Sequence, residues 1–153
     1  ALIQEIGPKE QKTVEKIAVC ITAQSNSKRL IDRGAFLADL LDGDLHILHV
    51  QQGSSIFHTA GTPQLLEELF AYGSKKGGMI HFHCDENVAR FLGDFTRQNG
   101  ITRLILGQPP MQDLADRQAL LDKLMAIVAN VDPSVPLVIV PREEGQADIT
   151  LRR

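Results

Sequence analysis

The chain has 153 residues, of which 43% are hydrophobic and 23% are charged, and its formal net charge at pH 7 is −3. This composition predicts one globular domain whose core is large enough to fold without disulfides or a structural metal. The weak negative charge argues against a general attraction to nucleic acid or to an anionic membrane. No apolar run approaches the roughly 20 residues of a membrane-spanning helix, and the first residues do not resemble a signal peptide. We therefore expect a cytoplasmic domain that inserts no segment into a membrane.

The sequence divides into three parts. Residues 1–15 are polar and lack a clear period, which is typical of a leader or linker. All the apolar segments fall within residues 16–141, which we expect to form the domain. Residues 142–153 form a polar tail, in which the sequence ITL (149–151) can pair with the edge of a sheet or with a partner.

Five short apolar runs are typical of strands that are covered on both faces, because they are rich in β-branched residues and do not alternate with polar ones. In chain order they are KIAVCIT (16–22), LHILHV (45–50), MIHFHC (79–84), TRLILG (102–107) and VPLVIVP (135–141).

Amphipathic stretches separate these runs, and each predicts a helix. In the first stretch, Ser25 or Ser27 is expected to cap the helix and Gly43 to end it in the left-handed conformation. Thr62 is expected to cap the second helix and Asp85 the third. The apolar stripes of the four helices are Leu30, Gly34, Leu37 and Leu41; Leu65, Leu66, Leu69 and Phe70; Val88, Phe91, Leu92 and Phe95; and Leu114, Leu121, Leu124, Met125 and Val128.

The alternation of five strands with four helices predicts an α/β fold. Such an order is typical of a doubly wound, open, five-stranded parallel sheet with right-handed crossovers and helices on both faces. In this architecture a ligand binds beyond the carboxyl ends of the strands, where the strand order reverses.

The loops expected at that edge are rich in amides and hydroxyls and have few acids or bases. Such groups suit hydrogen bonding to a base, a ribose or a phosphate better than they suit proton transfer. We therefore predict a nucleotide-binding crevice there. Its candidate residues are Thr22, Ala23, Ser25, Ser27, Val50, Gly107 and Gln108.

The serines just after the first strand, the LHV that ends the second and the ILG that ends the fourth carry a resemblance over residues 16–141. The chain resembles the universal stress protein superfamily, and most closely the domain of this type in potassium-responsive sensor histidine kinases of the KdpD type. The resemblance implies a regulatory or sensor domain that responds to potassium or osmotic stress by binding a ligand or a partner, and that belongs to the cytosolic part of a membrane-bound kinase. Its partners would be other domains of the kinase or its regulator. The alternative is a stand-alone universal stress protein that binds ATP or cyclic di-AMP.

The nucleotide motifs of these relatives are matched only in part. ATP-binding members carry Gly-x-x-Gly, nine further residues and Gly-Ser/Thr; here Gly107 matches the first glycine, while Pro110 and Leu120-Leu121 replace the rest. Because proline has no N–H to donate, this loop is expected to hold a triphosphate poorly. The Ser-x-Ser element of cyclic di-AMP binders matches residues 25–27, but residues 48–52 lack the aromatic side chains of its second half.

The resemblance also implies a homodimer, since such relatives pair their last strand, here residues 136–141, across an interface. The alternative is a monomer, if the domain lies within a larger kinase.

The remaining candidates favour a structural role. His81 and His83 are expected to share one face of a strand, whereas His46 and His49, three residues apart, face opposite sides. We therefore predict no metal site, because zinc needs three or four converging ligands. Cys20 and Cys84 are interpreted as reduced thiols of the core. The sequence has no nucleophile elbow, P-loop or paired nucleophile and base, so we expect no catalytic activity.

Overall fold

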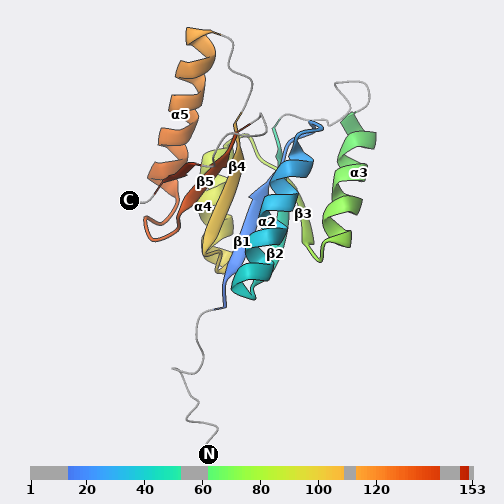
Figure 1. Cartoon of the computed structure of the whole chain (residues 1–153). Helices are drawn as coiled ribbons and strands as arrows, with labels where there is room; N and C mark the ends of the chain where they lie inside the picture. The colour runs from blue at the N-terminus through green and yellow to red at the C-terminus, as the bar shows by residue number, and fades with distance from the viewer. Residues whose placement is uncertain (1–13, 53–61, 109–112, 142–148, 152–153) are drawn as a thin grey trace, which may run out of the picture.

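A computed structural model describes residues 14–52, 62–108, 113–141 and 149–151, and within them a single sheet is flanked by helices on both faces (Figure 1). The strands are β1 (Lys16–Cys20), β2 (Asp44–Gln51), β3 (Met79–Cys84), β4 (Arg103–Gly107), β5 (Leu137–Val140) and β6 (Ile149–Leu151). The helices are α2 (Ser27–Leu41), α3 (Thr62–Lys75), α4 (Val88–Asn99) and α5 (Leu114–Asn130).

The sheet has the strand order β3-β2-β1-β4-β5-β6. The first five strands along the chain pair in parallel, as predicted, and β6 pairs antiparallel with β5. The strand order reverses at β1, whose neighbours are β2 on one side and β4 on the other. This confirms the doubly wound α/β fold and places its reversal point next to the loop that follows β1.

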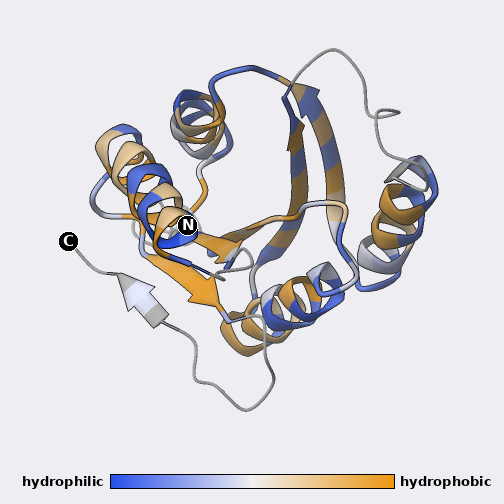
Figure 2. Ribbon diagram, turned by 90° about the horizontal axis from the view of Figure 1, so that it is seen from above, coloured by the Kyte–Doolittle hydropathy of each residue, from blue (hydrophilic) through white to orange (hydrophobic). Residues whose placement is uncertain are grey.

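The core has one layer on each face of the sheet. Under α2 and α3, the layer contains Ile17, Val19 and Ile105, which are fully buried. Under α4 and α5, it contains Ala18 and Leu104, also fully buried. Because successive residues of a strand point to opposite faces, β1 and β4 supply both layers with apolar side chains. The same holds for β5, whose four residues are all buried and which is hydrophobic along its whole length (Figure 2).

Two of the predicted helix ends differ from the structure in the first half of the chain. Neither Ser25 nor Ser27 caps α2; Asn26 precedes the helix and makes no side-chain capping bond. The left-handed residue at the other end is Asp42, with φ 54°, and not Gly43. Gly43 is needed for a different reason, because a Cβ atom there would lie 2.4 Å from the carbonyl oxygen of Glu15.

The third predicted cap is also displaced. Asn87, and not Asp85, caps α4 by accepting a hydrogen bond from the backbone N–H of Arg90 at 3.0 Å. Asp85 instead accepts from the N–H of Asn87 at 2.8 Å and so shapes the turn before the helix. At its other end α4 stops at Gly100, which is left-handed with φ 64°.

The packing of α5 differs most from the prediction. Leu114, Leu121 and Met125 are 77%, 53% and 69% exposed, so they do not belong to the core. Only Ile127 of this helix is buried, while Leu124 is half-buried. The helix packs along one narrow face, mainly against α4, and periodicity alone does not reveal how many neighbours a helix has.

The last strand occupies the edge that the sequence predicts as a dimer interface. β6 pairs with β5 through Leu137 and Leu151, Val138 and Thr150, and Ile139 and Ile149. The ITL segment therefore pairs with a sheet edge of its own chain, beyond the domain limit expected at residue 141. A second copy cannot use the same edge of β5 while β6 is paired to it.

The contact between α4 and α5 generates a testable prediction. A Cβ atom on Gly93 would lie 2.3 Å from the carbonyl oxygen of Asn130, a backbone atom that no rotamer change can move away. Gly93→Ala should therefore lower the free energy of unfolding by about 1–3 kcal/mol, although alanine favours the helix by up to about 1 kcal/mol. A urea titration measures this, with the exposed Gln98→Ala as the control. An unchanged midpoint for Gly93→Ala would contradict the close packing.

Candidate functional site

A cavity of about 210 Å³ lies at the carboxyl ends of β1, β2 and β4, where the strand order reverses. Five predicted site residues line it, namely Thr22, Ser27, Val50, Gly107 and Gln108. The other two, Ala23 and Ser25, lie outside the lining.

The walls of the cavity are mostly apolar and come from both core layers. The apolar lining residues are Ile21, Leu30, Val50, Val88, Leu92, Leu106, Leu120, Leu124, Ile127 and Ile139. Gln24, Asn26, Gln52 and Gln108 add side-chain amides, which can donate and accept hydrogen bonds. Such a cavity, apolar with a few polar groups, is typical of a site for a small organic ligand.

Lys123 is the only charged residue among the described ones that line the cavity. It comes from α5 and makes no ion pair within the described part of the chain. The sequence prediction missed it. The signal that could have found it is the helical spacing of residues 120, 123, 124 and 127, which places Lys123 on the face of α5 that closes the cavity.

Ser27 holds the turn between β1 and α2. Its Oγ donates to the carbonyl oxygen of Thr22 at 2.7 Å and accepts from the N–H of Thr22 at 3.3 Å. The side chain is only 1% exposed. These bonds use both the donor and one acceptor site of the hydroxyl, so its first role is to shape the wall of the cavity.

Several backbone N–H groups near the cavity already donate within the protein. The N–H of Gln24 bonds to the Thr22 oxygen at 2.8 Å, and that of Gln108 bonds to the Val140 oxygen at 3.1 Å. Gly107 has a packing role, since a Cβ atom there would lie 2.9 Å from Cδ1 of Leu30. The described part of this edge therefore offers few of the free backbone donors that hold a polyphosphate.

Cys20 forms part of the cavity wall. Burial raises the pKa of its thiol to about 11, and the positive charge of Lys123 offsets a part of this effect. The thiol therefore stays protonated at neutral pH and is a poor nucleophile. Cys84 ends the edge strand β3 and is exposed, so the interpretation of Cys84 as a core thiol is wrong.

The histidines lie on β2 and β3. His46 and His81 lie on the same face of the sheet, and Nδ1 of His46 is hydrogen-bonded to Nε2 of His81 at 3.0 Å. His49 lies on the other face, as its spacing predicts, and its Nδ1 atom contacts the carbonyl oxygen of Ile21 at 2.8 Å. Over the described ranges, no three His, Cys, Asp or Glu side chains gather as a metal site would require.

Burial lowers the pKa values of both histidines in this pair. For His46 the nearby charge of Asp44 partly opposes this effect and that of Lys16 adds to it. For His81 the charges of His46 and His83 add to the effect of burial. Both rings are therefore neutral at neutral pH, and one ring donates to the other.

Comparison with known proteins identifies the fold. No family model and no curated protein matches the chain. Among solved structures, a universal stress protein in complex with cAMP superposes with a TM-score of 0.62 at 16% identity, covering 86% of this chain and 100% of that one. A universal stress protein from Archaeoglobus fulgidus in complex with dAMP superposes with a TM-score of 0.56 at 14% identity, and the match covers 81% of this chain and 97% of that one. The universal stress protein UspA from Lactobacillus plantarum superposes with a TM-score of 0.56 at 15% identity, and the match covers 85% of this chain and 99% of that one.

At these identities the likeness establishes that the chain has the fold of universal stress proteins. The fold expected from the sequence resemblance is thus confirmed. None of these neighbours is a KdpD-type kinase. None of the helices in the described ranges combines the length and the apolar character needed to cross a membrane.

The role of Ser27 can be tested separately from ligand binding. Ser27→Ala removes two hydrogen bonds from a buried turn and should lower the free energy of unfolding by about 1–3 kcal/mol. Ser25→Ala, in the same turn but exposed, should change it by less than about 0.5 kcal/mol. Thermal unfolding of both variants without ligand makes the comparison. Equal melting temperatures would show that the Ser27 hydroxyl does not hold the turn.

The histidine pair predicts a dependence of stability on pH. Since the pKa values of His46 and His81 lie below 6.5 in the folded protein, the unfolded chain binds more protons as the pH falls below that value. The free energy of unfolding should therefore decrease from about pH 7.5 to about pH 5.5 and stop responding to this pair below the folded-state pKa values. Urea unfolding across this range measures the slope. His81→Gln should flatten it, and an unchanged slope would exclude the pair as its source.

Proposed function

We propose that this domain binds an adenine nucleotide in the cavity at the carboxyl ends of β1, β2 and β4. The observation that carries the proposal is the cavity itself, which is preformed at the reversal point and has apolar walls, several amides and one positive charge. Two proteins of the same fold have been solved with cAMP and with dAMP. Both ligands contain adenine and a single phosphate group.

The apolar part of the cavity suits the base. Leu30 of α2 approaches from one face of the sheet, and Val50, Leu124 and Ile127 approach from the other. Aliphatic side chains bury the faces of a purine ring, while Gln24 and Gln108 can bond to its edge. A volume of about 210 Å³ is below the roughly 300–1,000 Å³ of sites that enclose a whole drug-sized ligand. The cavity therefore encloses the base and part of the sugar.

The phosphate is expected at the mouth of the cavity, near Lys123. One ammonium group can pair with one phosphate. A triphosphate needs more donors, and the N–H groups of Thr22, Gln24 and Gln108 are already engaged. The Ser-x-Ser element is similarly unsuited to cyclic di-AMP, because Ser25 lies outside the lining and Ser27 is bonded to Thr22. We therefore rank AMP and cAMP above ATP and cyclic di-AMP.

Calorimetric titration of the protein with these four nucleotides and with adenosine tests the proposal. Leu124→Trp places a large ring in the cavity and should abolish binding. Leu121→Trp, on the same helix, is the matched control, because Leu121 is 53% exposed and does not line the cavity. Circular dichroism confirms that both variants fold. Equal binding by the two variants would place the ligand elsewhere.

A substitution at Lys123 tests the contact with the phosphate separately from the contacts with the base. Lys123→Gln should raise the dissociation constant of AMP by about twofold to fivefold, as expected for one exposed charge pair, and leave that of adenosine unchanged. Equal losses for the two ligands would contradict a phosphate contact. Competition between AMP and adenosine, followed by titration, confirms that they share one site.

A second candidate is regulation by docking, as in the sensor domain of a KdpD-type kinase. The shortage of free backbone N–H groups that could bind a phosphate favours this candidate. A domain that binds no nucleotide would act by docking a partner on its surface. A flat titration with all five ligands would support this candidate and contradict the first. The attachment to a kinase, and the response to potassium, stay predictions from the sequence resemblance.

A further inference from the structure

The strand β3 forms one edge of the sheet. Within the described residues only β2 pairs with it, so its outer edge carries backbone N–H and C=O groups without a strand partner. Natural proteins usually protect such an edge with lysine, proline or a very short strand. The β3 sequence, MIHFHC, has six residues, and none of them is Lys, Arg, Asp, Glu or Pro.

The opposite edge is protected in the usual way. There β6 has only three residues and covers β5, whose four residues are all buried. On β3, by contrast, Met79 and Phe82 are 58% and 41% exposed, and His83 and Cys84 are exposed too. A long and uncharged edge with exposed apolar side chains is a template for pairing with another strand.

We propose that β3 pairs antiparallel with β3 of a second copy of this chain, so that the two sheets become continuous across a twofold axis. The flanking charges identify the partner as a second copy. Lys75 and Lys76 precede the strand, and Asp85 and Glu86 follow it. Antiparallel self-pairing brings the basic end of each strand to the acidic end of the other, and it does so twice.

The alternation of side chains selects the register. Directly opposed residues lie on the same face of a sheet, so the twofold axis must pass through one residue of the strand. A register centred on His81 places Ile80 opposite Phe82 and Met79 opposite His83. Extended past the two ends of β3, the same register brings Lys76 towards Glu86, which a register centred on Phe82 does not. A pair of an aromatic and a β-branched residue is among the favourable cross-strand pairs.

The lysines are available for such contacts. Lys75 is exposed and makes no ion pair within the described part of the chain. Lys76 lies 3.7 Å from Asp32, but its ammonium group remains close to the surface, with 43% of its side chain exposed. The isologous interface therefore combines backbone pairing, a small apolar centre and complementary charged ends.

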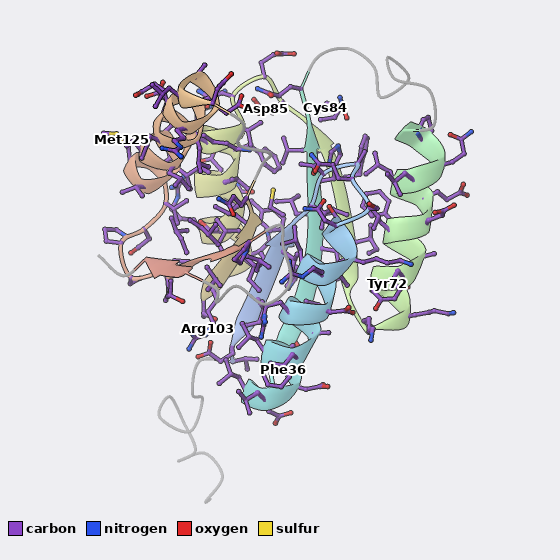
Figure 3. All side chains as sticks on the ribbon, turned by 45° about the horizontal axis from the view of Figure 1, so that its top comes forward. Phe36, Tyr72, Cys84, Asp85, Arg103 and Met125 are labelled. Carbon is purple, nitrogen blue, oxygen red and sulfur yellow. The ribbon has the colours of Figure 1, made fainter. Side chains whose placement is uncertain are left out.

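Sedimentation velocity of the full chain over a range of concentrations tests the proposal. The wild type should be a reversible dimer, and Met79→Lys should raise the dimer dissociation constant by at least about tenfold, because it places a lysine on the edge. Met125→Lys is the matched control, since Met125 is 69% exposed and lies on the opposite side of the molecule from Tyr72, which belongs to α3 beside β3 (Figure 3). A wild type that stays monomeric, or a dimer that Met79→Lys leaves intact, would overturn the proposal.

Charge reversal tests the register. Lys76→Glu should weaken the dimer by about tenfold, because in this register the two Lys76–Glu86 contacts across the twofold axis become repulsive. Adding Glu86→Lys to the same chain should restore it. Failure of the double variant to recover would overturn the antiparallel arrangement. The cavity at β1 and β4 is not part of this edge, so nucleotide binding and dimerisation should vary independently.

Discussion

The position of β1 between β2 and β4 is the constraint on which the candidate site depends. From β1 the sheet is built outward in both directions, so the loops after β1 and β4 turn to opposite faces and leave a space between them. That space is the cavity described above. Its walls are fixed by the core, because Leu30, Leu92 and Ile127 are buried residues of three different helices.

Within this frame, the same small residues serve both folding and the shape of the cavity. Gly107 lets Leu30 approach the end of β4, and Ser27 holds the turn after β1. A side chain can thus lie at a binding site for reasons unrelated to the ligand. Lys123 and the side-chain amides of Gln24 and Gln108 are different, because they supply polar groups to a cavity whose walls are mostly apolar.

The sequence was sufficient to predict the strands, the helices and the parallel order, because buried parallel strands are apolar throughout and their connecting helices are amphipathic. It also located the loops of the cavity. It did not reveal that the Ser27 hydroxyl turns back to Thr22, since a serine before a helix is more often a cap. Nor did it reveal that Met125 is exposed or that Lys123 lines the cavity. Both facts depend on where α5 sits against its neighbours, and periodicity defines the face of a helix without saying what lies opposite.

The two cysteines give the molecule a built-in chemical probe. Cys84 is open to solvent at the end of an edge strand, whereas Cys20 is half-buried and lines the cavity. A maleimide reaches the first directly, but it must enter the cavity to reach the second and then meets a thiol that is almost wholly protonated. The alkylation rate of Cys20 therefore measures access to the cavity and whether it is occupied, and the rate of Cys84 measures whether the edge of β3 is covered, without any cysteine being introduced.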